Sequence, residues 1–210
     1  MKQNLALLFV FLLNTLLFAE NPAEIHLWHA EKFNRKISNK LSVALEQDFR
    51  SESSLYYVHS DFGFKYEIGS RWAFNINFRE VFESKKGVWV SEHRPHGTVS
   101  TKVSLGALAI SARSRLEYRI KQDKDPVFRN RDMVTIKFGQ GFTALNIVPY
   151  IADEIFYDLE NKKLNRNRAY VGITIKSVPY LSPTVYLMKQ SDFKEYRWNS
   201  FLILGFKFNF

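Results

Sequence analysis

Strict alternation of large apolar and polar residues runs through most of this chain and limits the folds that it can adopt. In residues 72–82, one face carries Trp72, Phe74, Ile76, Phe78, Glu80 and Phe82, and the other carries Ala73, Asn75, Asn77, Arg79 and Val81. A period of two is that of a β-strand, whose successive side chains point to opposite sides. No stripe of helical period competes with it. The sequence therefore predicts an all-β protein.

Several alternating segments are 10 to 13 residues long, which exceeds the usual strand of a globular protein and suits a tilted strand that crosses a membrane. Candidate strands lie near 24–33, 40–51, 56–68, 72–83, 97–106, 108–120, 132–139, 143–158, 168–177, 182–190 and 198–210. Counting back from a periplasmic C-terminus gives ten strands. Segment 24–33 would be an eleventh that starts outside, so ten strands are favoured and twelve stay open.

The N-terminus has the pattern of a secretory signal peptide. Lys2 precedes an apolar stretch from Leu5 to Phe18, which Asn14 interrupts and which is too short to span a membrane as a helix. We expect residues 1–19 to be removed and residues 20–210 to form one barrel domain. Cysteine is absent, which excludes a lipoprotein anchor, a disulfide scaffold and a thiolate zinc site.

Alternation alone does not say whether the apolar face points inward, as in a soluble lipid-binding barrel, or outward, as in a membrane barrel. The polar face carries many charges, and aromatic residues of the apolar face gather near strand ends, as in an interfacial girdle: Trp72, Phe82, Tyr118, Phe206 and Phe208. The last stretch also resembles the signal that the barrel-assembly machinery reads, with Leu202, Leu204, Phe206, Phe208 and Phe210 at alternate positions. These features predict a closed antiparallel β-barrel in the bacterial outer membrane.

The connections between candidate strands alternate in length. Short turns fall at 68–71, 105–108, 139–142 and 178–183, and longer polar segments at 84–96, 121–131, 158–166 and 190–197. Short periplasmic turns and long surface loops are typical of outer-membrane barrels. Basic residues fall in the expected loops and would contact lipopolysaccharide phosphates: Lys85, Lys86, Arg94, Lys121, Lys124, Arg129, Arg131, Lys162, Lys163 and Arg166.

The polar face predicts a charge network inside the barrel. Its members are Glu46, Arg50, Arg79, Arg113, Arg115, Glu117, Arg119, Glu154, Arg168 and Lys176, and we expect Glu154 and Arg168 to pair across neighbouring strands. Such a network either fills a narrow lumen and ties its walls together or lines a narrow pore that prefers anions. The formal net charge of +9 is compatible with anionic solutes.

Catalytic and metal patterns are weak. A Ser nucleophile needs a His base, but no Gly-x-Ser-x-Gly motif is present. His93 and His96, three residues apart in an expected rim loop beside Glu92, leave open a hydrolase at the rim. We expect no catalytic residue, no metal site and no cofactor, and the export signal argues against nucleic acid as a partner. The expected partners are outer-membrane lipid, lipopolysaccharide, the barrel-assembly machinery and periplasmic chaperones.

An ordered set of motifs resembles the domain-of-unknown-function 2490 family of bacterial outer-membrane barrels. The matching stretches are Trp28, Glu92–Pro95, Arg113–Arg119, Pro149–Tyr157, Asn167–Gly172 and the terminal LGFKFNF, which together span most of the chain. The resemblance implies an outer-membrane barrel and supplies no activity. The expectation is therefore a structural barrel or a narrow solute channel, with a rim hydrolase and a soluble periplasmic lipid-binding barrel as alternatives.

Overall fold

The computed structural model describes residues 25–122, 124–139, 141 and 143–210, so the expected signal peptide lies outside the described residues. Eleven strands are found in this part of the chain. They are β1 (Ile25–Lys36), β2 (Leu41–Ser51), β3 (Leu55–Ile68), β4 (Trp72–Lys85), β5 (Val88–Leu105), β6 (Leu108–Lys121), β7 (Val127–Phe138), β8 (Ile147–Asp158), β9 (Lys163–Ile175), β10 (Ser182–Lys194) and β11 (Arg197–Asn209).

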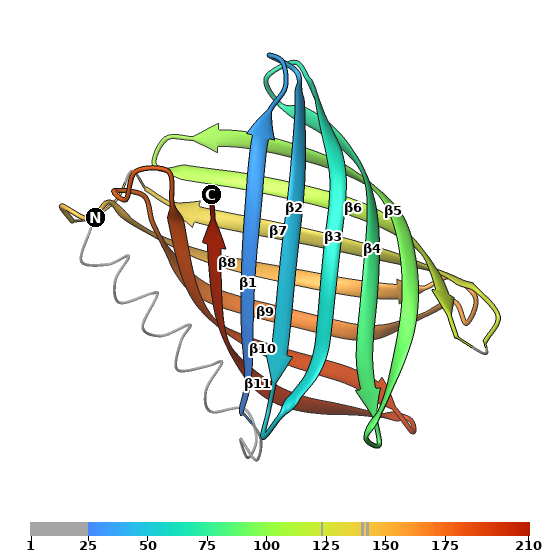
Figure 1. Cartoon of the computed structure of the whole chain (residues 1–210). Coiled ribbons are helices and arrows are strands. Elements are labelled where there is room, and N and C mark those ends of the chain that lie inside the picture. Colours follow the sequence, from blue (N-terminus) through green and yellow to red (C-terminus); the bar gives the residue numbers. More distant parts are fainter. Residues whose placement is uncertain (1–24, 123, 140, 142) are drawn as a thin grey trace.

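The strands form one closed barrel in which each strand pairs with its neighbours in sequence. In Figure 1 the near wall, β1 to β4, crosses the far wall steeply, as expected when strands tilt around a barrel axis. This confirms the all-β closed barrel. The strand number is eleven rather than ten, because segment 24–33 belongs to the wall as β1. Within the described ranges, no helix has the length and hydropathy that a transmembrane helix needs.

The barrel closes through a parallel pair, while every other pair is antiparallel. An odd number of strands joined by hairpins makes the first and last run in the same direction, so β1 and β11 meet in parallel from Ile25 beside Leu202 to Lys32 beside Asn209. Two backbone hydrogen bonds extend the seam, from Asn34 N to Phe210 O (3.0 Å) and from Phe210 N to Lys32 O (2.8 Å). We call the end of the barrel that holds Phe210 the C-terminal rim and the other end the opposite rim.

Connections at the opposite rim are short, which contradicts the expected long loops. Only Lys86 and Gly87 separate β4 from β5, and both have positive φ (51° and 82°), the backbone of a tight two-residue hairpin turn. Only Glu195 and Tyr196 separate β10 from β11. The longest connection, 139–146, lies at the C-terminal rim. Most residues of the segments expected to be loops belong instead to strands whose lumen faces are charged. Polarity alone does not distinguish such a strand from a loop.

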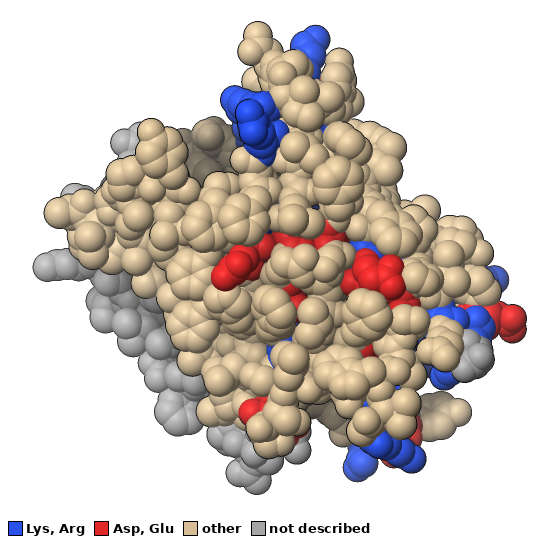
Figure 2. Space-filling view, viewed as in Figure 1, with Lys and Arg blue, Asp and Glu red and all other residues tan. Residues whose placement is uncertain are grey.

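The outer wall is largely apolar. Outward side chains such as Phe62, Phe64 and Phe78 are close to half exposed, and Figure 2 shows a mostly uncharged surface with basic groups near its edges. Acidic atoms also cross the near wall in Figure 2. One outward row of polar residues follows the register across β1 to β5: Glu31, Gln47, Ser60, Glu80 and His93. Its members bond to one another, as in the 2.8 Å contact from Ser60 Oγ to Gln47 Oε1.

The barrel interior beneath the seam is apolar. Trp28, Met188 and Ile203 are buried together there. The ring of Tyr186 lies over Gly205, where an added Cβ would be 2.0 Å from the Tyr186 Cζ atom, so only glycine leaves room for this ring. Ionic side chains occupy most of the remaining interior, and they form the candidate site.

Candidate functional site

Nine of the ten predicted network residues point into the barrel. They alternate with outward-pointing residues on β2, β4, β6, β8 and β9, as the period of two requires: Glu46, Arg50, Arg79, Arg113, Arg115, Glu117, Arg119, Glu154 and Arg168. Each makes at least one ion pair. Lys176 follows the end of β9 and is exposed, and no ion pair of it is found in the described part of the chain. Lys176 therefore lies outside the network.

Two carboxylates that are fully shielded from solvent occupy the centre of the lumen. Glu154 accepts hydrogen bonds from Arg113 (2.7 Å) and Arg131 (2.9 Å), and Arg168 lies 3.5 Å from it. Glu117 accepts hydrogen bonds from Arg129 (2.5 and 2.9 Å) and Arg131 (2.7 Å). Arg131 thus joins both carboxylates. We call Glu117, Glu154 and the arginines that they bind the central network.

Two further clusters flank the central network. Glu92 accepts hydrogen bonds from Arg119 (2.6 and 2.9 Å) and Arg94 (2.9 Å). On β2 to β4, Asp61 accepts a 2.7 Å hydrogen bond from Arg79, and Glu46 accepts a 2.6 Å hydrogen bond from Lys207 of β11. The second bond reaches over β1 and links β11 to β2, so an ion pair spans the seam.

Several members of these clusters were expected in loops. Arg94, Arg129, Arg131 and Arg166 lie on strands and point into the lumen, so the expectation that they lie in surface loops is wrong. The signal that could have identified them is the alternation itself, which continues through residues 127–138 with Arg129, Arg131 and Met133 on one face. The partners Asp48, His59, Asp61 and Glu92 were also absent from the predicted network.

A cavity of about 330 Å³ opens above the central network toward the opposite rim. We call it the arginine cavity, because eight arginines line it: Arg50, Arg79, Arg94, Arg119, Arg129, Arg131, Arg166 and Arg168. Lys194 adds a ninth cation, and Glu83 and Asp192 are the carboxylates among its lining residues. The carboxylates that bind most of these arginines do not line the cavity. The cavity therefore presents a strongly cationic surface.

Aromatic faces hold these arginines in place. The Arg50 guanidinium lies 3.6 Å from the centre of the Trp28 ring and 4.0 Å from that of Tyr57. Phe156 has four guanidinium groups within 4.6 to 5.6 Å of its ring centre: Arg129, Arg131, Arg166 and Arg168. A cation over an aromatic face gains electrostatic energy, most where water is excluded. These rings hold the arginine side chains in place, so the arginines lose little further conformational freedom when they bind a ligand.

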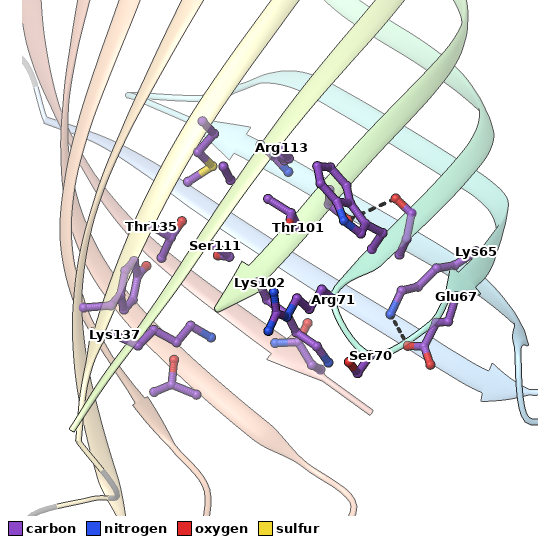
Figure 3. A pocket seen from close by; sticks show the side chains of 18 of the residues that line it. Lys65, Glu67, Ser70, Arg71, Thr101, Lys102, Ser111, Arg113, Thr135 and Lys137 are labelled. Carbon is purple, nitrogen blue, oxygen red and sulfur yellow. Dashed lines mark hydrogen bonds and ion pairs between the residues drawn. The ribbon is translucent and has the colours of Figure 1, made fainter. Parts of the chain in front are cut away.

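The lumen also opens toward the C-terminal rim. A cavity of about 640 Å³, the rim cavity, is lined by the cations Lys65, Arg71, Lys102, Arg113, Lys137 and Lys207 and by one carboxylate, Glu67. Figure 3 shows Arg71 and Lys102 close together, Lys137 on the facing wall and Lys65 joined to Glu67. A middle cavity of about 340 Å³ shares Arg113 with the rim cavity and Arg79 with the arginine cavity. The three spaces follow one another along the lumen.

The alternative sites find little geometric support. His96 and Glu92 point into the lumen, whereas His93 points outward and bonds to Glu80 (2.7 Å), so these groups do not converge at a rim. Within the described ranges, no three His, Asp or Glu residues are grouped so that they could hold a metal ion. A soluble lipid binder needs an apolar interior, but this interior is ionic and the outside is apolar. The described geometry therefore favours neither alternative.

Closed architecture, apolar outer wall and cation-lined lumen define a porin-like β-barrel. Among solved structures, the NanC porin matches with a TM-score of 0.50 at 10% sequence identity, over 80% of this chain and 87% of that one. An anion-selective porin from Comamonas acidovorans matches with a TM-score of 0.42 at 7% identity, over 83% of this chain and 54% of that one. The comparison with curated proteins found no match.

The family can be stated directly. The model of the family described as protein of unknown function DUF2490 matches residues 25–200, and this chain belongs to that family. The resemblance seen in the sequence motifs is thereby confirmed.

Proposed function

We propose that this protein is a narrow outer-membrane channel that prefers small anions. The observation that carries the proposal is the sign of the lumen surface. Nine cations and two carboxylates line the arginine cavity, and six cations and one carboxylate line the rim cavity. Walls that carry one sign of charge attract the opposite ion and repel the like ion along the whole passage.

The proposal includes an orientation in the membrane. Four of the alternate residues, Leu202, Leu204, Phe206 and Phe208, face outward on β11, and Phe210 directly follows the strand. They match the expected assembly signal, which is read in the periplasm. We place the C-terminal rim on the periplasmic side and the opposite rim at the cell surface. Lysines near the opposite rim, such as Lys86 and Lys162, would then lie near lipopolysaccharide phosphates.

Single cysteines test this orientation cleanly, because the chain contains none of its own. A membrane-impermeant maleimide added to intact cells should label Tyr196→Cys in the β10–β11 turn and leave Ser38→Cys in the β1–β2 turn unlabelled. Both variants should react after the outer membrane is permeabilised. If only Ser38→Cys were labelled on intact cells, the orientation would be the reverse of the one proposed. Recovery of the protein in the soluble periplasmic fraction would refute the outer-membrane location.

Ion selectivity tests the channel itself. Reversal potentials in planar bilayers under a KCl gradient should show chloride preference, and the double variant Lys102→Glu/Lys137→Glu should lower or reverse it. These lysines suit the test because neither forms an ion pair in the described part of the structure, whereas Arg113 holds buried Glu154. Lys86→Glu, the same charge change in the exposed β4–β5 turn, is the control. An unchanged reversal potential in the double variant would refute a cation-lined pathway.

A structural role is the second candidate, and burial of the central network favours it. Glu117 and Glu154 are fully shielded and bind arginines from several strands, so this layer can brace the walls of a closed lumen. Absence of single-channel steps from correctly folded wild-type protein would support bracing over conduction. Heat-modifiable gel migration would show that the barrel had folded.

A further inference from the structure

The arginine cavity holds more positive charge than its own carboxylates neutralise. Two of its lining residues are acidic, Glu83 and Asp192. Five more carboxylates bind its arginines from behind: Asp48, Asp61, Glu92, Glu117 and Glu154. A further carboxylate, Glu46, lies 3.9 Å from Arg79, but it accepts a 2.6 Å hydrogen bond from Lys207 outside the cavity, and these two charges offset each other. Nine lining cations against these seven carboxylates leave a surplus of two positive charges. Arg113 and Arg115, which share Glu154 and Glu117 from the middle cavity, only increase that surplus.

The surplus is concentrated on groups that are fixed. Arg50 stacks between Trp28 and Tyr57, and Arg168 lies within 5 Å of the ring centres of both Trp28 and Phe156. A guanidinium carries its N–H donors in the plane of the group, so a guanidinium that stacks by its face keeps its donors free at the edge. Arginines held in this way bind an anion without first losing rotamer freedom, which is the benefit of preorganisation.

The size and position of the cavity also suit a small ligand. Its volume of about 330 Å³ falls at the lower end of the range for small-molecule sites. Gln190 and Tyr56 add neutral polar groups to the lining, and Arg166 and Lys194 extend the cationic surface toward the opposite rim. Carboxylates and phosphates accept paired hydrogen bonds from arginine, and two carboxylates or one doubly charged phosphate would neutralise the surplus.

We propose that the arginine cavity binds one small organic dianion, a dicarboxylate or a phosphate monoester, before the solute reaches the central network. This inference rests on the proposed channel function and names the class of solute. A monoanion would leave one surplus charge without a partner, so a dianion should bind more tightly than a monoanion of similar size. The shared requirement is two negative charges close together on a small molecule.

Titration calorimetry of the folded, detergent-solubilised barrel tests the proposal. The probes are succinate, glycerol phosphate, lactate as the monoanion and putrescine as a dication of similar length. We expect succinate or glycerol phosphate to bind at least about tenfold more tightly than lactate, and putrescine not to bind. Comparison of succinate with glycerol phosphate distinguishes the two sources of the dianion. Equal affinity for lactate and both dianions would overturn the proposal.

Matched variants locate the binding. Arg166→Gln and Arg119→Gln each remove one lining cation while a partner remains for the carboxylate, Gln190 for Asp192 and Arg94 for Glu92. Each should weaken dianion binding about tenfold, a typical loss for one charge-assisted pair. Lys102→Gln in the rim cavity removes the same charge and should leave affinity unchanged. If all three variants weakened dianion binding equally, the binding would reflect the net charge of the lumen rather than a specific site, and the proposal would be overturned.

The outcomes separate this inference from the channel proposal. Chloride preference in bilayers without preference for dianions over lactate would leave the channel intact and overturn the site. Dianion binding without single-channel conductance would support the site and refute the channel. Heat-modifiable migration of each variant provides the folding control.

Discussion

The two ends of the lumen carry the same sign of charge in different ways. In the arginine cavity, guanidinium groups bind carboxylates behind them and stack on Trp28 and Phe156. In the rim cavity, Lys65 pairs with Glu67 and Lys207 pairs with Glu46, whereas Lys102 and Lys137 form no ion pair within the described residues. One end is a rigid array of donors and the other a flexible cationic funnel. Under the proposed function, the lysines of the rim cavity would attract a solute by charge, and the fixed arginines would select it by their arrangement.

Removal of a carboxylate should show the largest contrast between the two ends. Glu154→Ala leaves Arg113, Arg131 and Arg168 without their shared buried partner, and loss of one member of a buried ionic cluster costs about 3 kcal/mol or more. Glu67→Ala at the rim should leave stability unchanged, because its pair with Lys65 is exposed to solvent. Urea unfolding in detergent, followed by gel migration, measures both. Similar midpoints for the two variants would contradict the rigid-array interpretation.

Loss of an aromatic face should have an intermediate effect. Phe156→Leu keeps an apolar side chain at a fully buried position but removes the ring that four guanidinium groups surround. We expect a stability loss of about 1 kcal/mol and weaker succinate binding, because the arginines lose their common platform. Leu204→Ala on the outward face of β11 is a control that should leave succinate affinity unchanged. Wild-type affinity in Phe156→Leu would show that carboxylates alone hold the array.

The smallest effect, which concerns selectivity alone, is expected from the flexible end. Lys102→Gln should lower the chloride preference modestly in 0.1 M KCl and leave stability unchanged, since no partner loses a contact. At 1 M KCl the Debye length falls from about 10 Å to about 3 Å, so the effect should disappear. Reversal potentials at the two salt concentrations measure this. A shift of the same size at both concentrations would assign Lys102 a fixed contact rather than a mobile charge.

Much of the fold could be predicted from residue pattern. The alternation on β4, β6 and β11 assigned side chains such as Phe78, Arg113 and Phe206 to the correct faces, because a strand has a period of two in any sheet. Prediction failed at 88–96 and 127–131, which belong to β5 and β7, because polar residues on both faces of a strand resemble a loop. His93 and Glu80 show why: they bond to each other on the outer wall, and that compensation is invisible in the sequence.

The sequence by itself determined that the chain forms long strands with an apolar and a charged face, because side-chain periodicity is local. Tertiary structure decided that eleven strands close through a parallel β1–β11 seam, because direction and closure depend on all strands together. It also decided which charges meet. Arg131 of β7 joins Glu117 of β6 and Glu154 of β8 because the register of these neighbouring strands places both carboxylates diagonally beside it on the lumen face. The sequence thus determines that each strand has a charged face, and only closure of the barrel assembles these faces into the arginine cavity.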